Sequence, residues 1–321
     1  MRVATFNLES FGTDKADDPA LAARIALIRP QIERLDADIL CLQEINAQKV
    51  PGGPRQPLAL ERLVAGLPAA GFHRAWTGDL TSAPDIHTLA VFSRFPIARA
   101  DLLQHSFIDP PLWRRRTAEP PDADPVPCGW DRPILAVDIA LPDGRPLHVF
   151  NVHLRAPLAA PIPGGKASAT VWKRADAWAE GYAIAAMKRI GQAVELRCAI
   201  DRLFDAEPDA LVAAVGDFNA DAAASALRIA IADAEDTGNG ALAARSLVAV
   251  ERALAADQRH TVLHLGRPLM LDHILASRAL LGRLERVEVH NETLADEAIA
   301  PLREGGPFAS YHAPLLAVFR D

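Results

Sequence analysis

Residues Leu211-Val-Ala-Ala-Val-Gly-Asp-Phe-Asn219 run from an apolar strand directly into two polar side chains. Residues two apart in an extended chain face the same side, so Asp217 and Asn219 share one side while Phe218 points to the opposite one. Polar residues at the end of an otherwise apolar strand are typical of a site that a rigid scaffold holds in place. The stretch therefore predicts a packed strand that carries a functional pair at its C-terminal end.

Other predicted strands repeat this pattern of apolar residues followed by polar ones. Their polar residues are Asn7 and Glu9 after the first strand, Gln43 and Glu44 after Ile39-Leu-Cys-Leu42, Asn151 and His153 at the end of a hairpin, Asp272 within Met270-Leu-Asp-His-Ile274, and His312 before the last strand. Because residues two apart share a side, Asn7 and Glu9 are expected to point the same way. We expect all these side chains to converge on one site.

Strands and helices follow one another irregularly along the chain. Apolar patterns predict strands at 2–8, 38–45, 72–77, 89–93, 134–141, 146–154, 210–215, 260–265, 269–275, 284–290 and 315–319. Apolar residues at three- and four-residue steps, from Leu21 to Leu35, predict an amphipathic helix, and a shorter helix is predicted over 58–67. This order favours a single α+β domain of packed sheets over residues 1–321 rather than a regular βαβ array.

Two long segments lie in the middle of the chain. A long helix is predicted from about Ser168 to Phe204, with Met187, Ile190, Val194 and Cys198 as its buried stripe. Residues 105–133 contain seven prolines, which predicts a long loop that is functional or mobile. Its cluster Trp113-Arg-Arg-Arg116 is a candidate for phosphate contact, although a solvated surface loop is the favoured interpretation.

Composition narrows the choice of partner. The chain has 321 residues, half of them hydrophobic, and a formal net charge of −7. Proteins that hold long nucleic acids usually present a basic surface, so a short phosphate-bearing substrate fits this balance better. No apolar run approaches the roughly 20 residues of a membrane span, and the N-terminal residues show no secretory signal pattern. We expect a cytoplasmic protein with no obligate protein partner.

The polar residues have the types that phosphate-ester hydrolysis requires. A hard cation such as Mg²⁺ binds carboxylate and amide oxygens, and Glu44 is the best candidate ligand. A carboxylate such as Asp217 can orient the attacking water, and Asn219 can donate to that water or to a phosphoryl oxygen. An imidazole positioned by a carboxylate, as His312 is by Asp272, can act as an acid or a base or can donate to the phosphoryl group.

Seven short motifs occur in one order along nearly the whole chain. They are Thr5-Phe-Asn7, Gln43-Glu44, Leu89-Ala-Val-Phe-Ser-Arg-Phe-Pro-Ile97, Asn151-Val-His-Leu154, Gly216-Asp-Phe-Asn219, Leu271-Asp-His273 and Ser310-Tyr-His312. In this set and order the chain resembles the endonuclease/exonuclease/phosphatase family. Each motif alone is weak, but seven in order are specific.

The resemblance implies a fold, a cofactor and a set of roles. The fold would be a four-layer α/β sandwich of two packed mixed sheets flanked by helices, and the cofactor Mg²⁺ or Mn²⁺. The implied metal ligands are Asn7, Glu9 and Glu44, and the implied catalytic residues are His153, Asp217, Asn219, Asp272 and His312. His153 would contact the phosphate or donate a proton. Asn151 and Arg155 are the residues we expect to contact the substrate, and Arg132 is either a further phosphate contact or the partner of a carboxylate.

One departure from the family pattern bears on the metal. The family commonly has an acidic residue between the serine and the histidine of its last motif, where this chain has Tyr311. The number of bound metals, one or two, therefore stays open, and Glu9 is a candidate for compensation. His153 lacks an evident carboxylate partner, for which Asp85 is the only suggestion. His273, next to Asp272, is expected to pack in the core.

The sequence leaves three functions open. A phosphodiesterase, with a nuclease slightly favoured, acts through water oriented by Asp217 and an Asp272–His312 pair. A phosphomonoesterase or a lipid-headgroup phosphodiesterase uses the same chemistry on another substrate. A non-catalytic binding protein that has lost its metal is the least favoured, because five of the expected site residues are present. The leaving group, the preference for DNA, RNA or a small molecule, and the oligomeric state stay undetermined.

Overall fold

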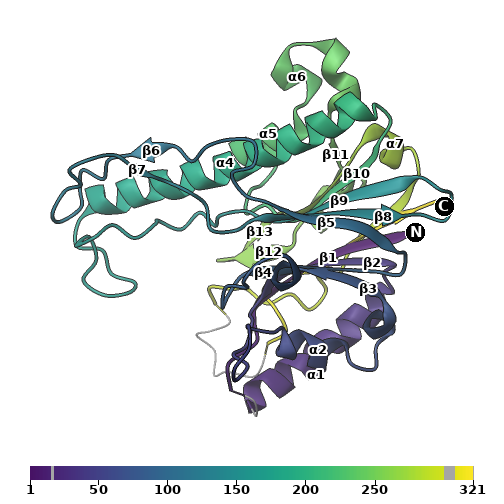
Figure 1. Cartoon of the computed structure of the whole chain (residues 1–321), viewed down its shortest axis with the longest axis horizontal. Helices are drawn as coiled ribbons and strands as arrows, with labels where there is room; N and C mark the ends of the chain where they lie inside the picture. The colour runs from purple at the N-terminus through teal and green to yellow at the C-terminus, as the bar shows by residue number, and fades with distance from the viewer. Residues whose placement is uncertain (16–17, 300–307, 321) are drawn as a thin grey trace.

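The computed structural model describes residues 1–15, 18–299 and 308–320 and contains two six-stranded sheets that pack face to face (Figure 1). The first sheet has, in spatial order, β15 (Leu284–Val289), β16 (Leu315–Phe319), β1 (Arg2–Phe11), β2 (Ile39–Ile45), β4 (Thr88–Ser93) and β3 (His73–Trp76). The second has β11 (Val248–Ala249), β14 (Asp272–Ala276), β10 (Leu211–Asp217), β9 (Pro146–His153), β8 (Ile134–Ala140) and β5 (Ile97–Leu103). Both sheets are mixed, since β1 runs parallel to β2 and β9 parallel to β10 while the other neighbours are antiparallel.

Helices cover the two outer faces. α1 (Pro19–Leu35) and α2 (Leu58–Val64) lie on the first sheet, and α4 (Ala175–Ala206) and α5 (Ser225–Ile231) lie on the second (Figure 1). The remaining short elements are α3 (Thr77–Leu80), α6 (Ala234–Thr237), α7 (Arg278–Leu281), the 3₁₀ turns Pro68–Gly71, Gly240–Arg245, Val250–Ala253 and Ala256–Gln258, and the pairs β6 (Leu112–Trp113) with β7 (Val126–Pro127) and β12 (Val262–His264) with β13 (Arg267–Leu269). The predicted four-layer sandwich is confirmed. None of the described helices is both long enough and apolar enough to span a membrane.

The central strands are apolar because both of their faces are covered. In β10, Leu211, Ala213 and Val215 belong to the core between the two sheets. Val212 and Ala214 point the other way, into the core beneath α4 and α5. A strand buried on both faces needs apolar residues at successive positions, which is why its sequence shows no alternation.

α1 follows the predicted pattern closely. Asp18 caps its N-terminus by accepting from the backbone N–H of Ala20 at 3.0 Å, and Pro19 occupies the first turn. The residues predicted to form its apolar stripe are buried against the first sheet. Such burial contributes about 1.5–3 kcal/mol for each large aliphatic side chain.

The prediction for the long helix was wrong in its start and in its buried face. α4 begins at Ala175, because Arg174 is extended and Lys166 bridges to Trp172. None of the four predicted stripe residues is fully buried, and Ile190 is 38% exposed. The buried face instead carries Ala193, Leu196, Ile200 and Phe204, together with the polar residues Gln192 and Glu195, which hold neighbouring loops. Buried polar residues interrupt the apolar period, so the period alone misplaced the face.

The proline-rich segment forms an arm with the first half of α4. β6 and β7, which were not predicted, pair beside this half of the helix, and both project beyond the sheets (Figure 1). The arm has a small core of its own, which includes Ala118, Cys128, Ile162 and Ile184. Trp113 donates to Glu180 at 3.0 Å and Arg115 pairs with Asp122 at 2.7 Å, so these two residues stabilise the arm. β5, which follows the Pro-Ile end of the third motif, was also missed.

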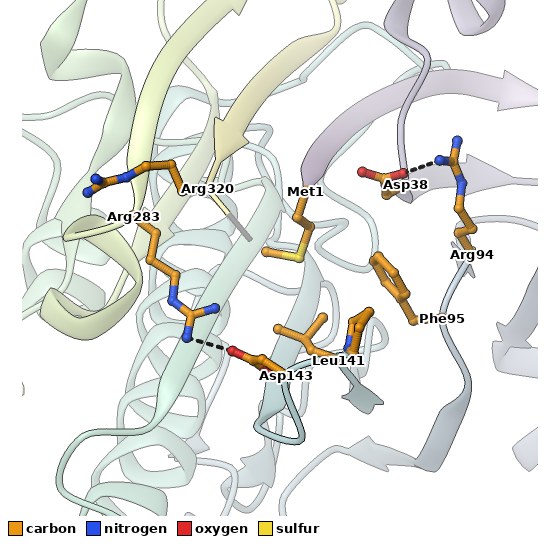
Figure 2. A pocket seen from close by; sticks show the side chains of 9 residues that line it. Met1, Asp38, Arg94, Phe95, Leu141, Asp143, Arg283 and Arg320 are labelled. Carbon is orange, nitrogen blue, oxygen red and sulfur yellow. Dashed lines mark hydrogen bonds and ion pairs between the residues drawn. The ribbon is translucent and has the colours of Figure 1, made fainter.

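One pocket lies where β1 begins and β16 ends. Met1, Arg94, Arg283 and Arg320 line it (Figure 2). The polar side chains predicted to form the site lie at the other end of β1 and of β10, because they follow the last residues of these strands. The pocket is therefore separate from the predicted site.

Candidate active site

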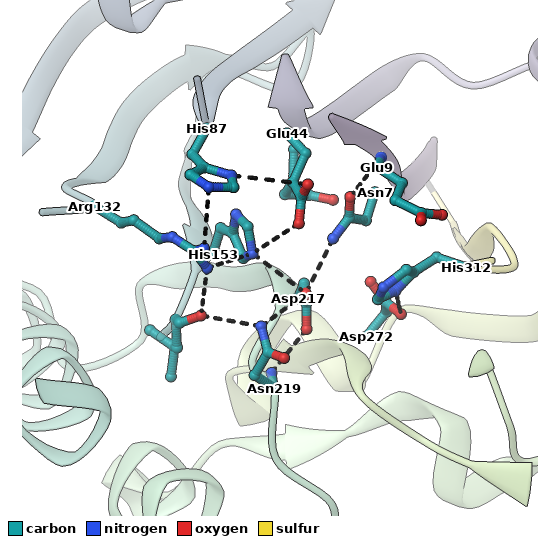
Figure 3. A network of polar contacts seen from close by, with 12 residues as sticks. Asn7, Glu9, Glu44, His87, Arg132, His153, Asp217, Asn219, Asp272 and His312 are labelled. Carbon is teal, nitrogen blue, oxygen red and sulfur yellow. Dashed lines mark hydrogen bonds and ion pairs between the residues drawn. The ribbon is translucent and has the colours of Figure 1, made fainter. Parts of the chain in front are cut away.

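Strand pairing brings the predicted polar residues to one end of the sandwich. In the parallel pair of β1 and β2, Asn7 lies opposite Gln43, and in the parallel pair of β9 and β10, Asp217 lies opposite His153. Asp217 also lies opposite Asp272, at the start of the antiparallel β14. Because the two sheets are packed face to face, the ends of β1, β2, β9 and β10 meet the start of β14, and Figure 3 shows the side chains of Asn7, His153, Asp217 and Asp272 close together.

Left-handed backbone conformations cluster at these strand ends. Glu9, Glu44, His87 and Asn219 have φ values of 50°, 57°, 62° and 48°. The strand register shifts between Asn7 and Phe11 and between Leu42 and Ile45, so bulges turn Glu9 and Glu44 out of the alternating pattern. The two-residue spacing was therefore not the reason that Glu9 reaches the site. Strained residues that persist together at one place are typical of a functional site.

Gly216 allows β10 to pass close to β9 directly before Asp217. Its φ is +136°, and a Cβ atom there would lie 2.1 Å from the backbone oxygen of Val152. We expect Gly216→Ala to destabilise the protein by about 1–3 kcal/mol or more, since it adds a backbone clash to a strained conformation. Urea unfolding would measure this, with Gly144→Ala as the control, because Gly144 also has positive φ but has open space around it. Equal losses in both variants would contradict the clash.

Asp217 is the centre of the polar network. Its Oδ1 accepts from the backbone N–H of Asn219 at 2.7 Å, and its Oδ2 accepts from the side-chain amides of Asn7 at 3.0 Å and Asn219 at 2.9 Å. The residue is 1% exposed. Burial, followed by the charge of Asp272, raises the pKa of Asp217 to about 7. The carboxyl group is thus held in one orientation and titrates near neutrality.

Asp272 and His312 form the predicted pair. The Nδ1 atom of His312 lies 2.8 Å from Oδ2 of Asp272, and both side chains are largely buried. Burial alone would lower the pKa of His312, but the charge of Asp272, their hydrogen bond and the nearby Asp217 and Glu44 raise it to about 10. His312 is therefore a cation at neutral pH and a hydrogen-bond donor rather than a base.

Several carboxylates gather around Asp217, which fits a bound cation. Glu44 and Asp272 both raise the pKa of Asp217, and Glu9 has a pKa raised by burial and by Glu44. Asp272 also has a buried Oδ1 atom without a hydrogen-bond partner. Two groups of three side chains have ligand atoms within 4.8 Å of one another: Glu44, His87 and His153, and Asp217, Asp272 and His312. These donors suit a divalent cation.

Glu9 and Tyr311 meet at the rim of the site. The Oε2 atom of Glu9 accepts from the backbone N–H of Tyr311 at 2.8 Å, while the ring of Tyr311 stacks on Phe308. The residue that replaces the family's acidic side chain thus contributes only its backbone here. A compensating role of Glu9 as a metal ligand stays a prediction.

Two predicted site residues are held by hydrogen bonds within the protein. Asn7 directs its amide nitrogen to Asp217, while its oxygen accepts from the N–H of Glu9 at 2.9 Å, so it orients Asp217. Asn151 is fully buried and donates to the backbone oxygens of Leu42 and Ala90 in the other sheet. These contacts tie the two sheets together and leave Asn151 no face toward a substrate.

His153 lies beside Glu44, Asp217 and Arg132. Its Nε2 atom is 3.4 Å from Glu44 and 3.5 Å from Asp217, and it accepts from Arg132 at 2.6 Å. Burial, then the charge of Arg132, lowers the pKa of His153 well below its usual value. A neutral imidazole that accepts at Nε2 has no proton there to give, so proton donation from this atom does not fit the arrangement.

His87 completes this flank of the site (Figure 3). Its Nδ1 atom lies 3.7 Å from Glu44, and its Nε2 atom lies 3.4 Å from Arg132. The only sequence signal for His87 is its place directly before the strand of the third motif. Among the described residues, the carboxylates within 4.0 Å of His153 are those of Glu44 and Asp217, so Asp85 is not its partner. His273 is buried as predicted, against Glu251 and the backbone oxygen of Ala220.

The raised pKa of Asp217 predicts a pH-dependent stability of the metal-free protein. Its ordinary value is 3.8 and its folded value about 7, so its contribution is complete below about pH 4 and is lost as the pH rises through 7. Asp217→Asn removes this dependence. We expect the unfolding free energy of the variant, relative to wild type, to increase between pH 4 and pH 8 in chelator. Denaturant titrations across this range test it, and a constant difference would contradict it.

The arrangement of carboxylates, a charged histidine and a buried acceptor for water defines a class, the phosphoester hydrolases that use a metal. The chain belongs to the Endonuclease/Exonuclease/phosphatase family, whose sequence profile matches residues 4–296. It is accordingly a phosphoesterase of a family that is in general dependent on a divalent metal. A search of curated proteins finds no match.

Solved structures of this family share the fold. A mannosyl-6-phosphatase of Bacteroides thetaiotaomicron has a TM-score of 0.61 at 17% identity, with 100% of both chains covered. A family protein from Leptotrichia buccalis has a TM-score of 0.57 at 14% identity, also with 100% of both chains covered. The 3′ phosphatase NExo from Neisseria, bound to a product DNA hairpin, has a TM-score of 0.54 at 19% identity and covers 100% of this chain and 99% of its own. At these identities the similarity concerns the fold.

Proposed function

We propose that this protein hydrolyses phosphodiesters of short nucleic acids or small molecules, by attack of a water that Asp217 orients. The observation that carries the proposal is the buried Asp217 carboxylate, fixed by Asn7 and Asn219 and facing the Asp272–His312 pair. A monoanionic diester is repelled less than a dianionic monoester by the carboxylates gathered at this site.

Asp217 has the properties of a general base. Its carboxylate accepts hydrogen bonds from two amides and one backbone N–H, which fixes its oxygens before the substrate arrives. A pKa of about 7 gives a fraction of ionised carboxylate at neutral pH with enough basicity to take a proton from water. Asn219 also donates to the backbone oxygen of Leu154, which holds its amide in place.

His312 supplies positive charge on the opposite flank. Because its pKa is about 10, it donates from Nε2 to a phosphoryl oxygen or to the leaving oxygen while Asp272 holds Nδ1. A divalent cation, Mg²⁺ or Mn²⁺, held by Glu44 with Glu9 beside it would neutralise charge on the phosphoryl oxygens when bound. A donor aimed at a developing oxyanion contributes about 10²–10³ in rate.

Hydrolysis of two simple esters tests the proposal. Purified protein with Mg²⁺ or Mn²⁺ would be assayed on an aryl phosphodiester and on an aryl phosphomonoester of the same leaving group. We expect the diester to have the larger kcat/KM, and we expect the activity to be absent from Asp217→Asn prepared in the same way. Turnover that persists in this variant would reject the role of Asp217.

A phosphomonoesterase is the second candidate. Two of the similar structures are described as phosphatases, and Arg132 places a buried positive charge beside the site. A larger kcat/KM for the monoester in the same assay would select this candidate.

A further inference from the structure

Arg132 is a buried arginine that lacks a carboxylate partner in the described part of the chain. It is 5% exposed, and no described carboxylate oxygen lies within 4.0 Å of its side-chain nitrogens. Its Nη1 atom donates to His153 and, at 3.1 Å, to the backbone oxygen of Leu154, while its buried Nε atom has no hydrogen-bond partner. Glu44, Asp217 and Asp131 act on its charge from beyond 4.0 Å, so none of them satisfies the Nε donor. Since a buried donor without a partner is costly, an anionic ligand is the expected partner.

The arginines of the pocket in Figure 2 provide a contrast. Arg94 pairs with Asp38 at 2.9 Å, and Arg283 pairs with Asp143 at 2.8 Å. The charges of these two arginines are balanced by the protein itself. Arg132 differs from them in being more deeply buried and in lacking such a partner.

Arg155 adds a second positive charge on the same flank. It is half-buried, and its Nε atom is also buried without a partner. Its charge helps to lower the pKa of Arg132, His87 and His153, which places it electrostatically close to all three. Among the described residues no carboxylate is within ion-pair distance of Arg155 either.

Gln192 of α4 holds both arginine-bearing segments. Its Nε2 atom donates to the backbone oxygen of Arg132 at 2.9 Å, and its Oε1 atom accepts from the backbone N–H of Arg155 at 2.8 Å. The residue is 1% exposed, so the clamp lies inside the protein. The backbone of both arginine-bearing segments is thus fixed before any ligand binds, which reduces the entropy lost on binding.

We propose that Arg132 and Arg155 form an anion subsite that binds the phosphoryl oxygens of the substrate, on the flank of the site opposite His312. Arg132 contacts the imidazole that lies 3.5 Å from Asp217, so the subsite borders the place where water is oriented. A planar guanidinium matches the spacing of two phosphoryl oxygens. The inference rests on the proposed function only in that the bound anion is the phosphoryl group of the substrate.

Binding of inorganic phosphate tests the subsite without turnover. Phosphate would be titrated into metal-free protein in chelator by calorimetry, at an ionic strength kept constant with chloride. We expect Arg132→Gln to bind phosphate about 10- to 100-fold more weakly than wild type, since charge-assisted hydrogen bonds are lost, and Arg155→Gln to bind it more weakly too. Arg283→Gln removes the same charge from the pocket of Figure 2 and should bind phosphate as wild type does.

Two further variants keep the test decisive. If Arg132→Gln does not fold, Arg132→Lys retains the charge but loses the planar pair of donors, and it should bind phosphate more weakly than wild type. Gln192→Met keeps both arginines and should also weaken phosphate binding. Wild-type affinity in Arg132→Lys and Arg155→Gln together, or no phosphate binding by the wild-type protein, would overturn the subsite. Intact phosphate binding without hydrolysis of any ester would instead reject the proposed function alone.

Discussion

Replacing Asp217 by asparagine is expected to lower kcat for ester hydrolysis by about 10²–10⁴-fold, the usual contribution of a general base. The change keeps the size of the side chain but removes its charge and replaces one acceptor oxygen by an NH2 group. Because it removes a buried carboxylate that Asp272 repels, the stability of the variant relative to wild type should be greater near pH 8 than near pH 4. Single-turnover kinetics and thermal unfolding measure the two effects.

The combination of lost activity with a relative gain in stability between pH 4 and pH 8 separates a catalytic role from a structural one. Replacing a residue that only supports the fold would lower both the activity and the stability of the protein. Asn219→Ala provides the matched control, since it removes one donor to Asp217 but keeps the carboxylate, and it should retain more activity than Asp217→Asn. Normal turnover by Asp217→Asn would contradict the proposed mechanism.

Replacing His312 by glutamine is expected to lower kcat by about 10²–10³-fold, as the loss of a donor to the transition state does. Glutamine can still donate a hydrogen bond but carries no charge, so the loss measures the positive charge. The fold should remain intact, because His312 contacts the site and does not belong to the apolar cores.

Asp272→Asn tests whether Asp272 keeps His312 protonated. Without the carboxylate, the pKa of His312 should fall from about 10 toward its ordinary 6.5, which NMR titration of the imidazole can follow. Activity should then fall as the pH rises through the lowered pKa, whereas wild type keeps its activity to higher pH. If the activity of this variant fell at the same alkaline pH as that of wild type, Asp272 would not set the protonation of His312.

Apolar sequence patterns predicted the elements whose burial depends on their own residues. α1 and the strand Leu211–Asp217 were predicted because an apolar period or run directly reports burial on one or two faces. The convergence of Asp217, Asp272 and His312 followed from polar residues at the ends of apolar strands. Glu9 and Glu44 also reach the site, although left-handed bulges rather than strand alternation turn them there.

Long-range packing places two further residues at the site: His87, which the sequence interpretation missed, and Arg132, whose role it left open between a phosphate contact and the partner of a carboxylate. His87 follows a loop and reaches Glu44 through a left-handed backbone, so no period indicates its direction. Arg132 comes from the proline-rich segment and is held by Gln192, which lies 60 residues further along the chain. The buried face of α4 was misplaced for the same reason, since Gln192 and Glu195 are buried for their hydrogen bonds to loops and not for hydrophobicity.

The most direct test of a metal-dependent phosphoesterase is hydrolysis of an aryl phosphodiester, and of its monoester counterpart, by the wild-type protein and by Glu44→Gln across a Mg²⁺ titration. We expect wild-type turnover to vanish in chelator and to return when Mg²⁺ is added in excess. Glu44→Gln should need at least about tenfold more Mg²⁺ for half of its maximal rate, because a neutral amide binds a hard cation more weakly than a carboxylate does. Turnover that is insensitive to chelator, or an unchanged Mg²⁺ requirement in Glu44→Gln, would contradict the account.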